Sequence, residues 1–310
     1  APAIVGRGPR RSMVGRALSI FSTGTEKPMT SSVGLVVVGY ESESEWEGFF
    51  DSVQKSTISP DQIVVVDNSP QLSVPQKISG ALSVQVIHRP SNPGYGAAAN
   101  AGVIALAPGI EWVVVCNPDT RFQKHTLDLL LAERDAFTHA GILGPSIVNP
   151  LNVVYPSARA IPGIRIGIGH ALFARLWPTN PWTTAYLGTY TDLNPRSVGW
   201  VSGAFLLINR EVFSSLDGFD EGFFMFFEDV DLGMRIKQAG YRNVYVPRAR
   251  VTHSGAASTT AHHKEMLLAH HRSAERFLSK LYPHPAQAPL RFALRVGLRI
   301  RAWLQTRKLR

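Results

Sequence analysis

Oxygen-bearing side chains directly follow one of the apolar runs of this 310-residue sequence, in a spacing that can bind a cation. Asn117-Pro118-Asp119 comes after Trp112–Val115, a run of strand length. Two such side chains one residue apart can converge on a hard cation such as Mg²⁺ or Mn²⁺, which keeps positions open for phosphate oxygens. The alternative is a proline-containing turn in which Asp119 caps the helix expected near Lys124.

The densest cluster of acids lies between Gly218 and Leu232, where five carboxylates alternate with phenylalanines and a methionine. Aromatic neighbours desolvate a carboxylate, and desolvation raises its pKa toward values useful for a general base. Alternatively, Glu228, Asp229 and Asp231 form the acidic first turn of a helix and interact with its dipole. The two interpretations are compatible, because an acid in a first turn can also face a cleft.

Two further segments carry weaker signals for ligand binding. Asp67 follows Ile63–Val66, where it either forms a turn or accepts hydrogen bonds from a nucleotide base or ribose. The segment Asn92–Asn100 contains Gly94 and Gly96, which let backbone approach a ligand at a helix start that favours anions. It lacks the spacing of a dinucleotide-binding or Walker signature.

The histidines are ambiguous from sequence. His253 follows the strand expected over Arg242–Val246, and the residue type alone favours an ordinary surface side chain over a ligand. The pairs His262-His263 and His270-His271 lie on an expected helix without carboxylates in a metal-site pattern. We therefore expect these two pairs on a solvated helix face.

The elements that must position these residues alternate between strands and helices. Continuous apolar runs of strand length occur at 33–38, 63–66, 84–87 and 112–115, with helical patterns between them. Such runs predict a mostly parallel sheet covered on both faces, with ligands at the carboxyl ends of its strands. A capping box of Ser42 and Glu45 is expected to start the first helix.

The second half of the sequence is less regular. Residues 150–198 lose periodicity, which is typical of a functional insertion or lid. Helices are expected over Phe227–Ala239, His262–Leu281 and Leu290–Leu304.

Composition and charge exclude several classes of protein. With 45% hydrophobic and 18% charged residues, the sequence is neither collagenous, nor a disulfide scaffold, nor fully disordered. The net charge of +9 comes from the ends: residues 1–32 hold five basic and one acidic side chain, and residues 291–310 hold seven basic and none acidic. Residues 33–290 hold 20 basic and 22 acidic side chains, so we expect no nucleic-acid partner.

Taken in order, six motifs resemble the inverting nucleotide-sugar glycosyltransferases of family 2, which have the GT-A fold. The resemblance runs from Val33 to Ser254 and rests on Val36-Val37-Val38-Gly39-Tyr40, Val64-Val65-Val66-Asp67-Asn68-Ser69, Asn92-Pro93-Gly94-Tyr95-Gly96 with Asn100, Asn117-Pro118-Asp119, Trp200-Val201-Ser202-Gly203-Ala204 and Glu228-Asp229-Val230-Asp231-Leu232. It implies an α/β protein of GT-A fold, with a single Rossmann-like, mostly parallel sheet flanked by helices and a C-terminal helical extension.

The resemblance also implies site roles. Nucleotide-sugar binding falls on Asp67, Asn92, Gly94, Asn100 and Asn117. Asp119 and His253 would hold a divalent cation, Mg²⁺ or Mn²⁺, and Trp200, Gly203 and Asp231 would lie on the acceptor side. Asp229 would be the base, with Glu228 as the alternative. Asn117 stands where many members have the first acid of Asp-x-Asp, which leaves one charge fewer for the metal.

Within the family, the sequence resembles the rhamnosyltransferases that move L-rhamnose from dTDP-rhamnose to N-acetylglucosaminyl-diphospho-polyprenol in cell-wall or polysaccharide synthesis. The implied mechanism is a single in-line displacement with inversion, in which Asp229 accepts the proton of the acceptor hydroxyl. The rival hypotheses are another donor sugar (galactofuranose, glucose or N-acetylglucosamine), a nucleotidyltransferase, and a non-catalytic lipid- or nucleic-acid-binding protein.

The expected organisation has three parts: a flexible basic arm over 1–32, a catalytic domain over 33–260 with its nucleotide-sugar half at about 33–120 and its acceptor half at about 121–260, and C-terminal helices over 261–310. Arg291, Arg295 and Arg299 form a basic stripe that we expect to contact an anionic membrane. The expected location is peripheral, on the cytoplasmic side of the cell membrane. The sequence leaves the oligomeric state open, a homo-oligomer included.

Overall fold

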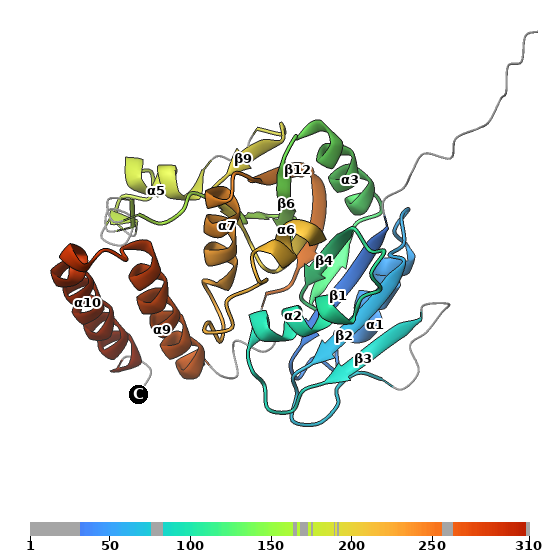
Figure 1. Cartoon of the computed structure of the whole chain (residues 1–310), viewed down its shortest axis with the longest axis horizontal. Helices are drawn as coiled ribbons and strands as arrows, with labels where there is room; N and C mark the ends of the chain where they lie inside the picture. Colours follow the sequence, from blue (N-terminus) through green and yellow to red (C-terminus); the bar gives the residue numbers. More distant parts are fainter. Residues whose placement is uncertain are drawn as a thin grey trace, which may run out of the picture. The chain divides into compact units, whose positions relative to one another are not determined.

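One ten-stranded mixed sheet organises the chain in the computed structural model (Figure 1). The structure describes residues 32–75, 83–163, 166–167, 173–174, 176–188, 190, 192–255 and 263–307, all within the unit Ser31–Arg310. Residues 1–31 of the expected arm and His262 lie outside these ranges. The strands are β1 (Val33–Gly39), β2 (Gln62–Asp67), β3 (Val84–His88), β4 (Trp112–Cys116), β5 (Thr120–Phe122), β6 (Ala140–Val148), β7 (Val154–Tyr155), β9 (Arg196–Val198), β11 (Phe205–Asn209) and β12 (Arg242–His253).

The sheet has the order β3-β2-β1-β4-β11-β6-β12-β5, with β7 beside β6 and β9 beside β12. β3, β2, β1 and β4 run parallel, as do β6 and β12. This confirms the predicted parallel strands in the first half of the chain. β11 was not expected to run antiparallel to both β4 and β6. A continuous apolar run contains no information on strand direction, so the sequence could not reveal this inversion.

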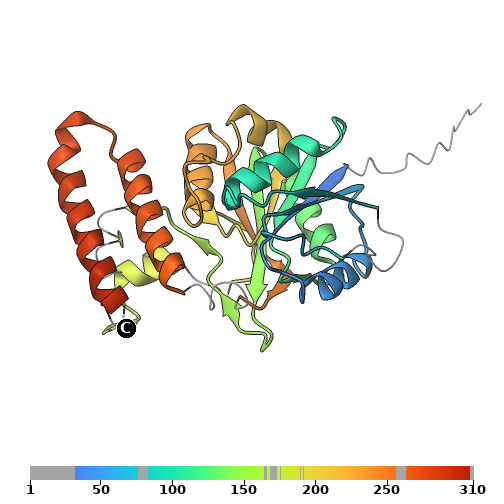
Figure 2. The ribbon, with the colours of Figure 1, turned by 90° about the horizontal axis from the view of Figure 1, so that it is seen from below.

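Helices cover both faces of the sheet, as predicted (Figure 2). On one face, α1 (Trp46–Gln54) and α3 (Thr126–Ala136) share a core cluster with alternate strand residues. On the other face, α2 (Tyr95–Ala105), α6 (Arg210–Ser215) and α7 (Glu228–Gln238) form the second cluster. β1 contributes side chains to both core clusters: Leu35 and Val37 belong to one cluster, and Val36 and Val38 to the other.

The predicted capping box does not form. α1 begins at Trp46, and Glu45 at its N-cap position makes no side-chain cap. Ser42 Oγ instead bonds to the backbone of Tyr40, and Glu45 accepts a hydrogen bond from Arg121 Nη2 at 2.6 Å. Helix formation here follows from burial of the apolar stripe that begins at Trp46, which the sequence predicted.

The irregular stretch 150–198 contains short elements in its described part. β8 (Ala158–Arg159) pairs with β10 (Trp200–Val201) in a separate two-stranded sheet, and α5 (Pro181–Leu187) is capped by Asn180, whose side chain accepts from Thr183 N. These elements span two to seven residues, which explains why no periodicity was visible. A lid function for this stretch stays a prediction.

The chain ends in a helical pair, α9 (His263–Leu281) and α10 (Ala288–Arg307), joined through a 3₁₀ turn at Pro285–Gln287. Phe277 of α9 is fully buried in a third core cluster with Phe223, Val230 and Trp200. α9 therefore packs against α7 and the loop before it. The expected boundary between 33–260 and 261–310 stays a prediction. In the described ranges, no helix combines the length and apolarity needed to cross a bilayer.

The predicted solvated histidine face is confirmed for His270, which is exposed, and wrong for His271. His271 is 8% exposed, and its Nε2 lies 2.9 Å from Gln305 Oε1 of α10. One side of the His270 ring contacts the rings of Phe226 and Phe227, with centroids 5.5 and 5.3 Å apart. Desolvation beside these rings lowers the pKa of His270 to about 4, assisted by the charges of His271 and Arg301. The sequence could not show the burial of His271, because Gln305 lies on another helix.

Candidate active site

The two predicted metal ligands lie side by side. Asp119 occupies the turn between β4 and β5, and His253 is the last residue of β12, which pairs with β5 through His253 and Thr120. His253 Nε2 lies 3.1 Å from Asp119 Oδ1 and 3.5 Å from Asn117 Nδ2. The antiparallel pairing of β5 and β12 thus brings together residues 134 positions apart in the chain.

This pair fits a divalent cation. Burial raises the pKa of Asp119, but the hydrogen bond and charge of His253 and the N–H of Gly255 outweigh it and lower the pKa below its ordinary value. The carboxylate is therefore ionised, as a metal ligand must be. The side chains are 16% and 20% exposed, which leaves access for further oxygen ligands. Among the described residues, no group of three or more His, Cys, Asp or Glu could hold a metal alone.

The start of α7 positions the predicted base. Phe226 and Phe227 both have left-handed backbones, with φ of 67° and 66°, immediately before the helix. Such conformations are costly for non-glycine residues and persist only where surrounding contacts hold them. Asp229 Oδ2 accepts a hydrogen bond from Gly203 N at 2.9 Å, and Oδ1 accepts one from Val230 N at 2.8 Å. Burial raises the pKa of Asp229, although these hydrogen bonds and the charge of Arg159 act against it.

Glu228 differs from its neighbour in access. It is only 6% exposed, and its Oε2 has no hydrogen-bond partner in the structure. Burial and the charge of Asp229 raise the pKa of Glu228 to about 8. Asp229, which is only partly buried, is thus the better placed of the two acids to meet an acceptor.

Tyr95 connects the predicted motifs, although the sequence did not single it out as a site residue. Its hydroxyl donates to Gly203 O at 2.6 Å. Burial raises its pKa well above the ordinary value, with added contributions from the nearby acidic groups of Cys116, Glu228, Asp229 and Asp119. The two carboxylates at the start of α7 and the cation-binding pair therefore share one neighbourhood around Tyr95.

Gly203 lies between the base and the strand end. Its N–H binds Asp229 and its carbonyl binds Tyr95, and the carbonyl of the next residue, Ala204, accepts a hydrogen bond from Asn117 N at 3.1 Å. A Cβ at Gly203 would lie 3.4 Å from the Cβ of Asp229. This predicted acceptor-side residue thus lies at the junction of the two halves of the site.

The segment before α2 requires a glycine at position 94. Gly94 has φ of 100°, and a Cβ there would lie 2.3 Å from Phe224 O. Tyr95 N donates to the same carbonyl at 2.9 Å, while Asn92 Oδ1 accepts from Gly94 N at 3.3 Å. These contacts hold the segment against residues 218–227, the loop before α7, which we call the acidic loop. Donor binding by Asn92 and Gly94 stays a prediction.

Two residues predicted to bind the nucleotide sugar have clear structural uses. Asp67 is fully buried, with Oδ1 accepting from Ser69 N and Oγ and Oδ2 accepting from Ser73 N. The amide of Asn100 donates to Phe219 O and accepts from Phe219 N, both at 2.9 Å. Asp67 thus forms the turn that was its alternative interpretation, and Asn100 holds the acidic loop. Direct contact of either residue with the donor stays a prediction.

Two predicted acceptor-side residues are also buried. Trp200 is 7% exposed, and its Nε1 donates to Ala160 O at 3.1 Å. Asp231 is fully buried, lies 2.7 Å from Arg235 Nε and forms an ion pair with Lys280 of α9. An acceptor contact of Asp231 or Trp200 stays a prediction. The sequence could not show that α9 covers this side of α7.

α9 holds the acidic loop through several contacts. Asp220 binds Arg276 Nη2 at 2.7 Å and Lys280 Nζ at 2.8 Å, and these partners lower its pKa although burial raises it. Ser273 Oγ donates to Met225 O at 2.7 Å. No local sequence pattern predicts these contacts, because the partners are about 50 residues or more apart.

The Asp231→Asn substitution should lower the free energy of unfolding by about 3–5 kcal/mol, because it leaves Arg235 and Lys280 without their shared buried carboxylate. Urea denaturation measures the change. The exposed pair of Asp51 and Lys55 provides the control, since Asp51→Asn should cost less than about 1 kcal/mol. Equal losses in the two variants would refute the structural role of Asp231.

The raised pKa of Glu228 predicts a pH-dependent stability. Between pH 4.5 and about 8, the folded state keeps a proton on Glu228 that the unfolded state has lost. The unfolding free energy should therefore fall as pH rises through this window. Glu228→Gln should reduce that fall, whereas Glu47→Gln on the exposed face of α1 should not. Denaturation series from pH 5 to pH 8 would disprove the assignment if both variants behaved like the parent.

Comparisons with known proteins agree with this geometry. Residues 30–268 match the family described as glycosyltransferase like family 2. The chain is 38% identical over 289 residues to an N-acetylglucosaminyl-diphospho-decaprenol L-rhamnosyltransferase of Mycobacterium tuberculosis, covering 90% of this chain and 94% of that protein.

Two solved structures share the fold at low sequence identity. One is a mannosyltransferase from Pyrobaculum calidifontis in complex with GDP-Man and Mn²⁺, 16% identical, with a TM-score of 0.52 over 85% of this chain and 68% of that one. The other is GalNAc-T7 with UDP, GalNAc and Mn²⁺, 18% identical, with a TM-score of 0.53 over 74% of this chain and 45% of that one.

Proposed function

This chain belongs to glycosyltransferase family 2 and has the GT-A fold, and from that premise we propose that it transfers L-rhamnose from dTDP-rhamnose to a polyprenyl-diphosphate-linked N-acetylglucosamine. Enzymatic glycosyl transfer follows from the family itself. The donor and acceptor come from the printed activity of the mycobacterial relative, whose similarity extends over nearly the whole of both chains. The single structural observation that supports the proposal is the hydrogen-bonded link between the two parts of the site: Gly203 N binds Asp229, and the neighbouring Ala204 O accepts from Asn117, which lies beside the Asp119–His253 pair.

In this proposal Asp229 is the general base. The Gly203 and Val230 N–H groups orient its carboxylate, and its partial burial keeps the pKa high enough to accept a proton from the acceptor hydroxyl. The deprotonated oxygen attacks the anomeric carbon, and the dTDP group leaves from the opposite side. No covalent intermediate with the enzyme is required.

Asp119 and His253 would hold a divalent cation, Mg²⁺ or Mn²⁺, on the donor side. Such a cation stabilises the negative charge of a departing diphosphate. Asn117 adds an amide beside the pair instead of a second carboxylate, so the site carries one formal negative charge from protein. The amino end of α2, which begins at Tyr95, adds the partial positive charge of a helix start.

A donor panel tests this function directly. The purified enzyme would be incubated with a short-chain lipid-diphosphate N-acetylglucosamine and, separately, with dTDP-rhamnose, UDP-galactofuranose, UDP-glucose or UDP-N-acetylglucosamine. We expect transfer from dTDP-rhamnose alone, detected by mass spectrometry of the lipid product. Transfer from another donor only would reject the rhamnosyl assignment and leave family membership intact.

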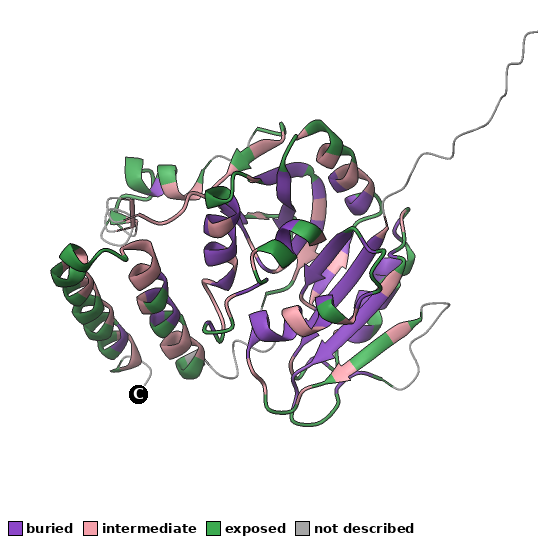
Figure 3. Cartoon of the chain, in the orientation of Figure 1, coloured by how far each residue is buried: buried purple, intermediate pink, exposed green. Residues whose placement is uncertain are grey.

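We also propose that α10 attaches the enzyme peripherally to the cytoplasmic side of an anionic membrane, through an apolar face rather than the basic stripe. Arg291 donates to two backbone carbonyls, and Arg295 and Arg299 face Glu275 of α9. The face of α10 beside these arginines contains the exposed apolar side chains Phe292, Val296, Ile300 and Trp303, and Figure 3 colours much of α10 as exposed. An exposed apolar face with arginines beside it is typical of helices that lie in a membrane interface.

The double variant Ile300→Ser, Trp303→Ser should bind vesicles that contain phosphatidylglycerol about 100-fold more weakly, because burial of two large apolar side chains contributes roughly 3 kcal/mol or more. Vesicle cosedimentation measures the binding. Leu151→Ser, which removes an even more exposed apolar side chain from a loop, should leave vesicle binding unchanged. Vesicle binding of the double variant at the parental level would exclude the membrane role of this face.

A further inference from the structure

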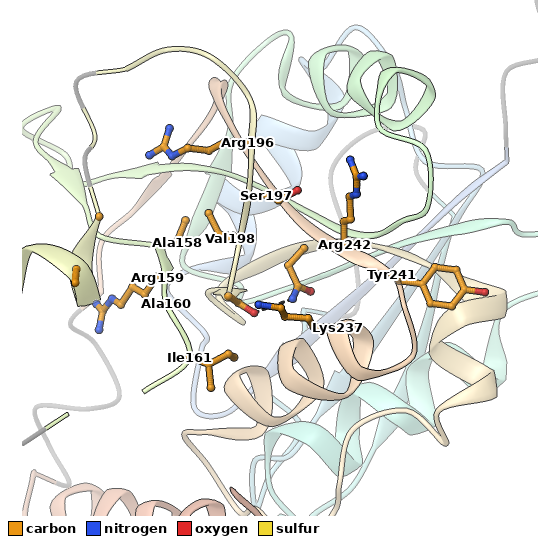
Figure 4. Close-up of a pocket in the computed structure, with 14 residues that line it drawn as sticks. Ala158, Arg159, Ala160, Ile161, Arg196, Ser197, Val198, Lys237, Tyr241 and Arg242 are labelled. Carbon is orange, nitrogen blue, oxygen red and sulfur yellow. Dashed lines mark hydrogen bonds between the residues drawn. The ribbon is translucent and has the colours of Figure 1, made fainter. Parts of the chain in front are cut away.

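A cavity of about 560 Å³ lies outside the cation-binding pair and the acidic loop. Its walls are residues 158–161 and 196–199 on one side and the carboxyl end of α7 with the start of β12 on the other (Figure 4). Four lining side chains are cationic and none is a carboxylate: Arg159, Arg196, Lys237 and Arg242. Figure 4 places the first two on one side of the cavity and the last two on the other.

No carboxylate side chain lies among the described residues that line the cavity. Lys237 and Arg242 make no side-chain hydrogen bond or ion pair with any other described residue, and both are exposed. Arg196 lies over the ring of Tyr245, 4.8 Å from its centroid, and donates to the backbone carbonyls of Asp192 and Asn194. A concave surface with charges of one sign concentrates ions of the other. The cavity is therefore suited to a multivalent anion.

Arg159 connects the cavity to the reaction centre. Its guanidinium lies over the ring of Trp200 at 5.4 Å, and its neighbours Tyr155 and Tyr186 hold it from two further sides at 5.3 and 5.5 Å. Arg159 pairs with Trp200 of β10, three residues before Gly203, whose N–H donates to Asp229 Oδ2 at 2.9 Å. One end of the cavity is therefore connected to the residue beside Asp229 through β10.

The geometry points to this cavity as the binding site for the diphosphate of the lipid-linked acceptor. This inference rests on the proposed function, in which a sugar hydroxyl meets Asp229 while the diphosphate occupies the other end of the same sugar. Guanidinium and ammonium groups bind phosphate oxygens through charge-assisted hydrogen bonds, and Lys237 and Arg242 have no other side-chain partner among the described residues. A nucleoside diphosphate carries the same chemistry, so the experiment must separate the two sources.

The test uses the double variant Lys237→Ala, Arg242→Ala in the full-length chain. Its control is Lys55→Ala, Lys124→Ala, which removes the same charge from exposed positions away from the cavity. We expect the KM for the acceptor to rise about 10- to 100-fold in the cavity variant, as the loss of charge-assisted hydrogen bonds implies, with an unchanged KM for dTDP-rhamnose. A higher KM for the donor would assign the cavity to the nucleotide and overturn the inference.

A second measurement does not depend on turnover. Calorimetry with inorganic pyrophosphate in EDTA should detect a site in the parent and the control that the cavity variant lacks. A short-chain lipid-diphosphate N-acetylglucosamine should compete for that site, and dTDP should not. Equal pyrophosphate binding by parent and cavity variant would refute the inference. Failure of the rhamnosyl assignment would appear in the donor panel instead. The pyrophosphate calorimetry would still test whether the cavity binds a diphosphate.

Discussion

The Asp229→Asn enzyme should lose transfer activity about 10²- to 10⁴-fold in kcat, the usual contribution of a general base. Asparagine retains the size of aspartate and one oxygen for the Gly203 N–H, but it accepts no proton from the acceptor. Donor binding should persist, because the proposed role of Asp229 is toward the acceptor hydroxyl. Steady-state kinetics and calorimetry with dTDP-rhamnose measure the two quantities separately.

Glu228→Gln provides the comparison for this prediction. Glu228 is buried, and its Oε2 has no partner, so its removal should change stability more than kcat. If Glu228→Gln abolished transfer while Asp229→Asn remained active, the base would be the buried acid. Melting temperatures of both variants distinguish lost chemistry from lost folding.

Removal of the cation should be the second large effect. EDTA should abolish transfer, and Mg²⁺ or Mn²⁺ should restore it. Asp119→Ala and His253→Ala should each lower kcat/KM about 100-fold or more, because a cation on the leaving group contributes several kcal/mol and each 1.4 kcal/mol, approximately, is tenfold in rate. Direct binding of Mn²⁺, followed by electron paramagnetic resonance, should weaken in both variants.

Exposed residues of the same types serve as controls for the cation prediction. His125→Ala and Asp135→Asn change side chains that are 60% and 71% exposed and lie away from the pair. Both should retain Mn²⁺ binding and activity. Full activity of the parent enzyme in EDTA would contradict a role for the cation.

The sequence predicted those parts of the site that depend on strand ends. Asp119 was predicted as a cation ligand because it follows an apolar run, and His253 through the family resemblance; Asp119 lies just beyond β4, and His253 is the last residue of β12. Their meeting depends on the pairing of β5 with β12, which the structure provides and no local pattern encodes. The buried stripe of α1 was also readable, because helical periodicity is local.

Contacts between remote elements were not predictable in the same way. The burial of Asp231 and His271 was not predictable, because it depends on Lys280 of α9 and Gln305 of α10, and no local pattern marks these partners. Arg159 was missed because its role depends on three aromatic rings from separate segments. The contacts of Arg295 and Arg299 in α10 were not predictable for a related reason: their partner, Glu275, lies on another helix.

The central claim is that a base at Asp229 drives a single displacement at the anomeric carbon of the donor sugar. The most direct measurement is the configuration of the new glycosidic bond, determined by NMR of the product formed from dTDP-rhamnose and the lipid-diphosphate acceptor. The account predicts a configuration inverted relative to the donor. A product with retained configuration would contradict it, because a single displacement at the anomeric carbon cannot retain the configuration.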